Sequence, residues 1–428
     1  MRNLEHMLHP KSVAIIGGGT WCVDVVKQCQ KMGFSGEIWC VHPKKSEIEG
    51  VACYASIDDL PAAPDASFIG VNRFATIEVV RALNAKGAKG AVCFASGFSE
   101  AVHEDAQGAD LQDQLLEAAG EMAVLGPNCY GFINYLDRAL LWPDQHGGMP
   151  VDSGVAIITQ SSNIVINLTM QMRGLPVAFV STVGNQAQIG LADMGAAILN
   201  DPRVTALGLH IEGIDDLEGF QTLAAQAERL GKPIIALKVG ASEQAQAATI
   251  SHTASLAGSD AGARALFKRL GIAQVADLST FLEALKVAHV YGYLDNAQVV
   301  SMSCSGGEAS LMADLGAPLG VEFPPLNDAQ KRGLGAALGP MVALANPLDY
   351  HTYIWGDQDA MTATFTAAVQ GTNAMGILVL DFPRADRCET HVWRGVISCI
   401  AAAQKTAGRP IGIVGSVVEP MPEECGPA

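Results

Sequence analysis

The sequence lacks the features that mark nucleic-acid-binding, membrane and disulfide-rich proteins. Lys and Arg number 27 against 44 Asp and Glu, a net charge of −17, and no basic stretch could track a phosphate backbone. No apolar run approaches the roughly 20 residues needed to cross a bilayer, and no signal-peptide pattern opens the chain. The ten cysteines form no C-x-x-C pair and no metal-ligand spacing. We therefore expect a soluble, cytoplasmic protein without disulfides, metal, nucleic acid or membrane partners.

One segment also has almost no bulky apolar side chains. Residues 240–259 are mostly small or polar, so they can bury little surface, and they include one imidazole, that of His252. Such a composition fits a mobile loop that carries a phosphoryl group on His252, with hydroxyl and glycine neighbours as hydrogen-bond donors. A disordered surface loop with an incidental histidine is the alternative.

Short β-branched runs alternate with amphipathic stretches along the 428 residues, as in βαβ units. Because the runs are apolar throughout, we expect an α/β protein with strands buried on both faces of parallel sheets. The first series, at 12–16, 37–41, 66–71 and 90–94, predicts a doubly wound, Rossmann-like sheet. Two later series predict flavodoxin-like sheets, one with strands at 154–159, 177–182, 206–211, 233–239 and 272–275, the other with strands at 298–303, 374–380 and 410–414.

Glycine and proline clusters, and a short polar stretch near 294–296, mark two boundaries between these series. We expect a first domain over 1–143, a second over 150–293 that includes the loop at 240–259, and a third over 296–428. The chain stops soon after the last expected strand, which suggests an incomplete third domain and a gene that continues past Ala428.

A glycine turn joins the first strand to the following helix, where helix amides can hold a phosphate. It consists of Gly17, Gly18, Gly19 and Thr20 and does not follow the G-x-G-x-x-G spacing. No acidic residue ends the second strand to bind a ribose, as in NAD enzymes, and a lysine pair that includes Lys44 stands there instead. We therefore expect a phosphate-bearing nucleotide other than NAD, with a turn required only for close packing as the alternative.

Three further strings place polar groups at turns. Residues 159–163 lie between a strand and an apolar helix, so they form either a second phosphate cradle or an ordinary N-cap. Residues 126–131 predict a rigid turn that presents Asn128 and the thiol of Cys129, which no nearby histidine marks as activated. Glu212 follows a strand, where its carboxylate is either a partner for an imidazole Nδ1 or a solvated loop residue.

Together these strings resemble the nucleoside-diphosphate-forming acyl-CoA synthetases, the superfamily of succinyl-CoA synthetase and ADP-forming acetate–CoA ligase. The resemblance covers essentially the whole chain, and the string at 251–260 is similar to the family's phosphohistidine loop. The resemblance to the family rests on Val-His-Pro-Lys (41–44), Ala-Ser-Gly-Phe-Ser-Glu (95–100), Gly-Pro-Asn-Cys-x-Gly (126–131), Thr-Gln-Ser-Ser (159–162), Thr-Val-Gly-Asn-Gln (182–186), Ile-Glu-Gly (211–213) and Ser-His-Thr-Ala-Ser-Leu-Ala-Gly-Ser-Asp (251–260).

The resemblance implies an acid–thiol ligase that reversibly converts a carboxylic acid, CoA and ATP to acyl-CoA, ADP and phosphate. An acyl phosphate and CoA would exchange at one site, and His252, oriented by Glu212, would carry the phosphoryl group on a swinging loop to a distant ATP-grasp site. The implied phosphate-binding residues are Gln160, Ser161, Ser162, Asn163, Gly184 and Asn185. The implied CoA-binding residues are Gly17, Gly18, Gly19, Thr20, Lys44, Val71, Asn72, Arg73, Ser96, Gly97 and Phe98. Asn128 and Cys129 mark the implied acyl and thioester site.

The chain departs from the family pattern in its first glycine loop and at Ser162, where a glycine is usual. Nothing in it reads as an ATP-grasp domain. The resemblance therefore implies CoA and a carboxylic acid as substrates, with ATP, ADP and Mg²⁺ held on an ATP-grasp domain or β subunit outside this chain, in a homo- or hetero-oligomer. Aromatic residues beside polar ones at 140–147 and 351–357 could line an acid pocket larger than acetate needs, or lie in the core.

Two other functions compete with the ligase. A CoA-binding regulatory module, or the CoA-ligase-like part of a protein acetyltransferase, would keep the fold without the relay. Such a protein would be expected to lose His252 or Glu212, and both are present. An NAD-dependent dehydrogenase would need an acidic residue near position 42, which is absent. The sequence thus favours the ligase and leaves the acid unassigned.

Overall fold

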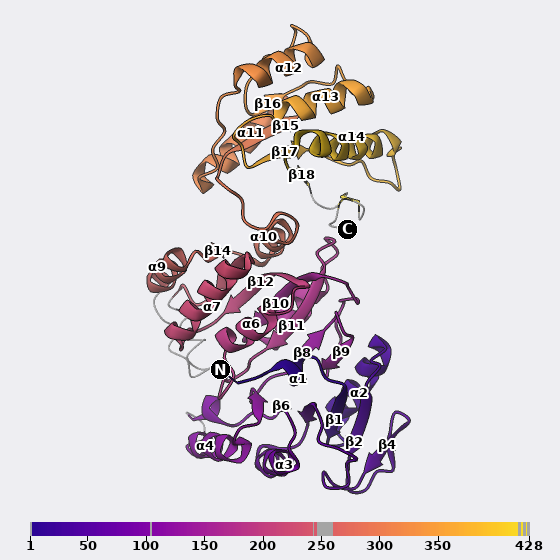
Figure 1. Ribbon diagram of the computed structural model, residues 1–428, viewed down its shortest axis with the longest axis vertical. Coiled ribbons are helices and arrows are strands. Elements are labelled where there is room, and N and C mark those ends of the chain that lie inside the picture. The colour runs from indigo at the N-terminus through magenta and orange to yellow at the C-terminus, as the bar shows by residue number, and fades with distance from the viewer. Residues whose placement is uncertain are drawn as a thin grey trace. The chain divides into compact units, whose positions relative to one another are not determined.

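The computed structural model describes residues 2–102, 105–242, 244–245, 260–417, 421–422 and 425. The chain divides into two compact units, Met1–Gly292 and Tyr293–Ala428. Figure 1 shows two sheets in the first unit and one in the second, and most neighbouring strands in each sheet are parallel. The predicted α/β class is therefore confirmed.

The first sheet has the doubly wound order β3-β4-β2-β1-β5-β6-β7. Its strands are β1 (Ser12–Ile16), β2 (Glu37–Val41), β3 (Glu47–Ile48), β4 (Val51–Tyr54), β5 (Ala66–Ile69), β6 (Gly90–Cys93) and β7 (Ala123–Leu125). The helices of this half are α1 (Glu5–Leu8), α2 (Thr20–Met32), α3 (Arg73–Lys86), the 3₁₀ turn η1 (Ser99–Ala101) and α4 (Gln107–Ala119). Along β1, Val13 and Ile15 belong to a core that includes α2, whereas Ala14 and Ile16 belong to one that includes α3 and α4. Since successive side chains face opposite sides of a sheet, helices on both sides explain the continuous apolar run.

The second sheet has the order β14-β13-β12-β10-β11-β8-β9. Its strands are β8 (Phe132–Asn134), β9 (Ala139–Leu141), β10 (Gly154–Thr159), β11 (Val177–Thr182), β12 (Val204–Ile211), β13 (Ile234–Lys238) and β14 (Ala273–Val275). Its helices are α5 (Ser162–Thr169), α6 (Leu191–Leu199), α7 (Leu217–Leu230), α9 (Asp260–Leu270) and α10 (Leu278–Tyr291). The five parallel strands follow the flavodoxin order, in which loops at the carboxyl ends of the strands form binding sites.

The two sheets of the first unit share one hydrophobic core. Strand β8 pairs antiparallel with β11 and with β9, so both belong to the second sheet although they precede the boundary expected near 143–150. Strand β9 also contacts the first half, because Cys29 Sγ of α2 lies 3.3 Å from the carbonyl oxygen of Leu140. The division into three domains at those boundaries stays a prediction.

The second unit contains a four-stranded parallel sheet of order β16-β15-β17-β18. Its strands are β15 (Val299–Ser303), β16 (Leu348–Asp349), β17 (Met375–Val379) and β18 (Ile411–Val414). Its helices are α11 (Gly306–Gly316), the 3₁₀ turn η2 (Ala317–Leu319), α12 (Asp328–Leu338), α13 (Gln358–Ala368) and α14 (His391–Ala407). This unit has its own hydrophobic core.

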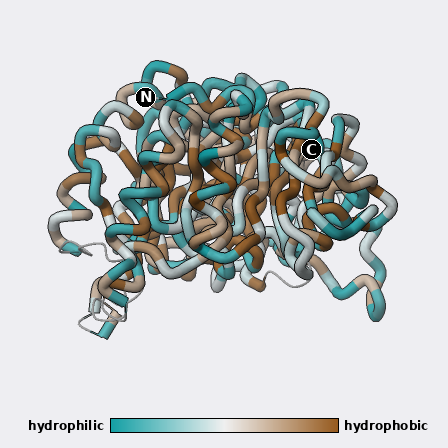
Figure 2. Tube along the Cα trace, turned by 90° about the horizontal axis from the view of Figure 1, so that it is seen from below, coloured by the Kyte–Doolittle hydropathy of each residue, from teal (hydrophilic) through white to brown (hydrophobic). Residues whose placement is uncertain are grey.

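Strands such as β1 and β10 are buried at every position. Figure 2 shows hydrophobic and hydrophilic residues alternating along much of the trace. In the part of the chain that the structure describes, no helix is both long enough and apolar enough to traverse a bilayer. The helices instead present one apolar stripe to a sheet, as α7 does with Phe220, Leu223 and Ala227.

Candidate active site

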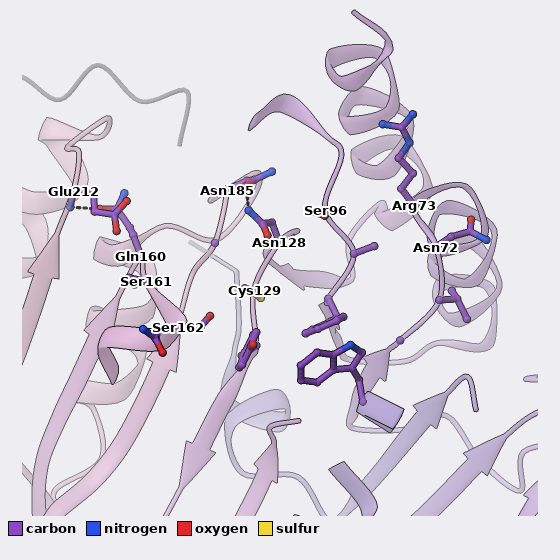
Figure 3. A pocket seen from close by; sticks show the side chains of 18 of the residues that line it. Asn72, Arg73, Ser96, Asn128, Cys129, Gln160, Ser161, Ser162, Asn185 and Glu212 are labelled. Atoms are coloured by element: carbon purple, nitrogen blue, oxygen red, sulfur yellow. Dashed lines mark hydrogen bonds between the residues drawn. The ribbon is translucent and has the colours of Figure 1, made fainter. Parts of the chain in front are cut away.

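A cavity of about 1090 Å³ lies in the first unit, at the carboxyl edges of both sheets. Apart from Trp21 in α2, its lining residues follow strands β5, β6 and β7 of the first sheet and β10, β11, β12 and β13 of the second. Thirteen of the predicted site residues line it, namely Val71, Asn72, Arg73, Ser96, Asn128, Cys129, Gln160, Ser161, Ser162, Asn163, Gly184, Asn185 and Glu212. Figure 3 shows the group of Gln160, Ser161, Ser162 and Glu212 on one side, Asn72, Arg73 and Ser96 on the other, and Asn128, Cys129 and Asn185 between them.

The turn between β10 and α5 brings the start of a helix to this cavity. Ser161 is the N-cap residue of α5, but its side chain makes no capping hydrogen bond. Thr159 Oγ1 instead fixes the turn by accepting a hydrogen bond from the amide of Ser161 at 2.9 Å. The Ser161 side chain is therefore not a capping group, and the phosphate cradle at 159–163 stays a prediction. Because Ser161, Ser162 and Asn163 line the cavity, the amides and the positive end of the helix dipole favour an anion there.

The turn after β12 holds Glu212 by its main chain. Gln160 Oε1 accepts hydrogen bonds from the amides of Glu212 (2.5 Å) and Gly213 (3.1 Å), and Gln160 Nε2 donates to the carbonyl of Gly213 at 3.3 Å. Lys238 Nζ donates to the carbonyl of Glu212 at 2.8 Å. These contacts engage the carboxamide of Gln160, so its side chain holds the turn at Glu212 and Gly213. The role of Gln160 as a phosphate ligand stays a prediction.

The turn after β11 packs directly on the turn at 126–131. The amide of Asn185 donates to the carbonyl of Pro127 at 3.0 Å, and Asn128 Nδ2 donates to Asn185 Oδ1 at 3.4 Å. Gly184 has a φ of +53°, and a Cβ added there would lie 2.2 Å from the carbonyl oxygen of Pro127. Glycine at position 184 therefore lets the predicted phosphate loop meet the predicted thioester turn.

We expect the substitution Gly184→Ala to lower the midpoint of thermal unfolding by several degrees. The added methyl group combines a left-handed backbone with a clash against main-chain atoms, which together cost about 2 to 4 kcal/mol. Gly231→Ala is the matched control, because Gly231 has a φ of +67° and open space around the added Cβ, so only the backbone cost of about 1 kcal/mol applies. Equal shifts in the two variants would show that the contact with Pro127 contributes nothing.

The two residues of the predicted thioester site differ in character. Asn128 is exposed and has a φ of +57°, a conformation that asparagine tolerates. Cys129 is 1% exposed, and burial raises the pKa of its thiol well above the usual value. The thiol therefore stays protonated, and Cys129 is not an activated nucleophile.

The residues after β5 form the opposite wall. Asn72 Oδ1 accepts hydrogen bonds from the amides of Phe74 and Ala75, which caps α3. Arg73 donates from Nη1 to the carbonyl of Gly97 at 2.8 Å and from Nη2 to Asp105 Oδ2 at 2.5 Å. Backbone hydrogen bonding and the Arg73 guanidinium lower the pKa of Asp105, so this wall carries a fixed ion pair.

Seven predicted CoA-binding residues do not line the cavity, namely Gly17, Gly18, Gly19, Thr20, Lys44, Gly97 and Phe98. Lys44 is exposed, and it is Lys45 that reaches the glycine turn, donating from Nζ to the carbonyl of Gly18 at 2.7 Å. The amides of Gly97 and Phe98 donate to the carboxylate of Glu100 at 2.6 and 3.2 Å, and Phe98 is fully buried. A role for these seven residues in CoA binding stays a prediction.

His252 lies outside the residues that the structure describes, so its predicted role is not tested here. The described chain nearest to it on the N-terminal side includes Gly240 and Ala245, and both line the cavity. After the gap the chain resumes at Asp260, the first residue of α9. Ala245, the last described residue before the segment that contains His252, therefore lies at the wall of this cavity.

Comparisons with known proteins agree with this arrangement. Residues 11–135 match the family described as a CoA binding domain, and residues 152–288 match the family described as a succinyl-CoA ligase like flavodoxin domain. The α subunit of ADP-forming acetate–CoA ligase I of Pyrococcus furiosus is 30% identical over 363 residues, which make up 81% of this chain and 76% of the relative. The chain belongs to the ADP-forming acyl-CoA synthetase family.

Other members of this synthetase family are longer. An ADP-forming acetate–CoA ligase of Methanocaldococcus jannaschii is 31% identical over 81% of this chain and 49% of its own length. A trans-feruloyl-CoA synthase from an unknown prokaryotic organism is 28% identical over 86% of this chain and 53% of its own length. The chain thus spans about half the length of the first curated relatives it matches. A solved structure of a dinucleotide-forming acetyl-coenzyme A synthetase of Ca. Korarchaeum cryptofilum has the same fold, with a TM-score of 0.83 at 24% identity over 97% of this chain and 89% of that one.

Several residues that line the cavity or lie near the ends of its strands were not predicted as site residues from the sequence. Trp21, Phe94 and Tyr130 line the cavity and contact one another. The sequence indicates a place at the site only through their positions, which are beside the glycine turn, after a strand end and after the Asn-Cys pair. His210 and Lys238 are buried near the ends of their strands. His210 lies in β12, two residues before Glu212, and Lys238 is the last residue of β13. Burial lowers the pKa of Lys238, whereas the negative charges of Asp260 and Glu212 raise it. A polar residue that ends an otherwise apolar strand is the signal that could have revealed both.

The strings at 140–147 and 351–357 contribute to cores. Trp142 is fully buried and packs edge-on against Tyr130, with ring centroids 5.5 Å apart. Trp355 packs against the core of the second unit and meets Trp393. The core alternative holds for both tryptophans, and neither lines the cavity in the first unit.

His210 makes the stability of the first unit depend on pH. Its Nδ1 lies 3.1 Å from Oγ1 of Thr159, the last residue of β10, and burial lowers the pKa of His210 from 6.5 to about 4. Because the unfolded chain then binds more protons between these values, stability is full above pH 6.5 and falls as the pH drops toward 4. At pH 4.5 the loss amounts to on the order of 2 to 3 kcal/mol.

We expect His210→Gln to reduce this acid sensitivity, measured as the difference in thermal midpoint between pH 7 and pH 4.5. His391→Gln, at an exposed position of the second unit, is the matched control. His146, whose pKa burial also lowers to about 4, preserves part of the slope in both variants. An unchanged slope in the His210 variant would contradict the assignment of a buried, neutral imidazole.

Proposed function

We propose that this chain is the CoA-binding and phosphoryl-transferring part of an ADP-forming acyl-CoA synthetase, an acid–thiol ligase. The complete reaction would convert a carboxylic acid, CoA and ATP to acyl-CoA, ADP and phosphate, reversibly. The observation that carries the proposal is a single cavity that joins an uncapped helix N-terminus, the carboxylate-bearing turn at Glu212 and the Asn128 turn. Membership of the synthetase family supports the same activity.

In the direction that consumes the acyl-CoA thioester, the proposed reaction begins at the thioester carbonyl. A phosphate oxygen attacks the thioester carbonyl, the C–S bond breaks, and the CoA thiolate leaves and takes up a proton, which gives an acyl phosphate. The amides at the start of α5 would hold the phosphate and stabilise the charge that develops on it. Asn128 and Asn185, which share a hydrogen bond across the junction of the two sheets, would orient the reacting carbonyl.

The second step would transfer the phosphoryl group to His252. Nε2 attacks phosphorus, the bond from phosphorus to the acyl oxygen breaks, and the carboxylate leaves. Glu212 would accept the Nδ1 proton in a hydrogen bond and stabilise the imidazolium that forms. The position of Ala245 at the cavity wall supports access of His252 to the acyl phosphate.

The return of the phosphoryl group to ADP would require an ATP-grasp domain or β subunit with Mg²⁺, neither of which was recognised in this chain. Two relatives in Pyrococcus furiosus are named as α subunits, which supports a partner subunit, whereas the longer relatives support a fused domain. We infer a cytoplasmic assembly of this kind. Relatives named for acetate, 4-hydroxybutyrate and trans-ferulate support a carboxylic acid as substrate and leave its class open.

Arsenate-dependent cleavage of acyl-CoA tests the proposal with this chain alone. Arsenate would replace phosphate in the first step, and the acyl arsenate would hydrolyse in water, so CoA thiol is released at each turnover without ATP or a partner. We expect release from at least one of acetyl-, butyryl-, benzoyl- and cinnamoyl-CoA that depends on arsenate. CoA binding without release from any of them would overturn the ligase and favour a regulatory module.

A further inference from the structure

Three aromatic side chains form one wall of the cavity, which we name the aromatic wall: Trp21, Phe94 and Tyr130. Their ring centroids are 5.1 Å apart for Trp21 and Phe94, 5.5 Å for Phe94 and Tyr130, and 5.9 Å for Trp21 and Tyr130. All three line the cavity, whereas aromatic residues make up 6% of the chain. The rings come from three separate places in the sequence, the start of α2, the end of β6 and the turn after β7.

Two buried rings hold the aromatic wall in place. Phe68 packs behind Phe94 with centroids 5.7 Å apart, and Trp142 packs behind Tyr130 at 5.5 Å, and both are fully buried. Trp21 is different, because 42% of it is exposed. A large apolar side chain that is half exposed inside a cavity and supported from behind is a surface prepared for a ligand rather than part of the core.

The aromatic wall lies at the thioester end of the cavity. Tyr130 follows Asn128 by two residues, and its amide donates to Thr182 Oγ1, at the end of β11, at 3.1 Å. The wall is therefore joined to the turn that holds Gly184 and Asn185, next to the proposed phosphate site. In an acyl-CoA the acyl group is bonded to sulfur, and the long pantetheine arm separates both from the adenine. A group beside the reacting carbonyl is therefore the acyl chain and not the adenine.

We propose that the aromatic wall binds the acyl group and selects carboxylic acids with an aromatic ring or a similarly large, flat apolar group. This inference rests on the proposed function. A ring stacked against Trp21 and Phe94 would bury apolar surface that acetate is too small to cover. Burial raises the pKa of the Tyr130 hydroxyl, so Tyr130 stays neutral and the wall does not repel a carboxylate.

The preference among thioesters tests this inference with the arsenate assay and the full chain. We expect benzoyl- and cinnamoyl-CoA to exceed acetyl-CoA in kcat/KM by about 10-fold or more. Trp21→Ala should lower kcat/KM for the aromatic thioesters at least about 10-fold and leave that for acetyl-CoA nearly unchanged, and Trp21→Phe should retain most of the preference. Because Trp21 is half exposed on a helix surface, its loss should not unfold the protein. Tyr353→Ala is the matched control, since Tyr353 is an exposed aromatic residue of the second unit and does not line the cavity.

The outcomes separate this inference from the proposed function. Cleavage of acetyl- or butyryl-CoA in preference to both aromatic thioesters would overturn the inference and leave the ligase in place. An equal loss for all thioesters in Trp21→Ala would also overturn it, because that result assigns Trp21 to CoA itself or to the fold. Absence of cleavage with every thioester would overturn the proposed function. Quenching of tryptophan fluorescence by free cinnamate, lost in Trp21→Phe and absent with acetate, is the result expected from direct binding.

Discussion

Replacing Ser162 with proline is expected to lower arsenate-dependent thioester cleavage by about 10²-fold or more while the protein stays folded. Ser162 is the first residue of α5 and lines the cavity, so its amide, which has no partner within the helix, is available to an anion there. Proline is well tolerated at the first helical position and removes this donor together with the serine hydroxyl, so Ser162→Ala, which removes the hydroxyl alone, is measured beside it and should keep most of the activity. Ser161 has φ −106° and ψ 116°, a conformation that proline permits in the residue before it. Loss of one donor to a developing oxyanion typically costs this much.

Asp328→Pro is the matched control for this substitution. Asp328 is exposed at the first position of α12 in the second unit, and the preceding Asn327 has φ −76° and ψ 172°. The control should keep full activity, and circular dichroism should show native helix content in both variants. Full activity of the Ser162 variant would show that the start of α5 does not hold the reacting phosphate or arsenate.

Replacing Glu212 with glutamine is expected to slow phosphorylation of the chain by about 10²-fold or more without slowing arsenate-dependent cleavage. The known contacts that hold this turn use the main chain of Glu212, through Gln160 and Lys238, so the turn should survive the change. An amide lacks the charge with which a carboxylate stabilises an imidazolium. It also favours the histidine tautomer in which Nδ1 carries no proton, as the replacement of aspartate by asparagine does in serine proteases. Only the step that uses His252 should therefore be affected.

Glu218→Gln removes an equal charge from an exposed site in the first turn of α7 and serves as the control. The two rates can be measured on the same preparation, phosphorylation with acyl-CoA and radiolabelled phosphate, and cleavage with acyl-CoA and arsenate. Equal phosphorylation rates in wild type and the Glu212 variant would reject the orienting role. A parallel loss in both assays would assign Glu212 to the acyl phosphate instead.

The fold could be predicted in detail because its sheets are parallel and buried on both faces. Strands expected at 12–16, 37–41, 154–159 and 177–182 coincide with β1, β2, β10 and β11, since each is a continuous β-branched run bounded by turn residues. Strands β8 and β9 were not predicted. They have three residues each, and an antiparallel pair that extends a parallel sheet leaves too short a pattern to recognise.

Site residues in the turns that follow strands could be predicted from the sequence, whereas site residues that side-chain packing brings together could not. Positions 160–163, 184–185 and 212 follow strand ends, so topology alone places them at one edge. The sequence predicts Gln160 only as a phosphate ligand, since it cannot show that the carboxamide of Gln160 binds the main chain of Glu212 and Gly213. Trp21, Phe94 and Tyr130 are more than thirty residues apart in sequence, and only the folded chain brings their rings together. The roles proposed for all these residues stay predictions until they are tested.

Mapping of the phosphorylated residue tests the central claim most directly. The chain would be incubated with a cleaved acyl-CoA and radiolabelled phosphate, digested, and analysed by mass spectrometry. We predict about one phosphoryl group per chain, labile in acid and stable in base, on the peptide that contains His252. The variant His252→Ala should carry no label yet still cleave the thioester with arsenate. Label on another residue, or equal labelling of His252→Ala, would contradict the relay.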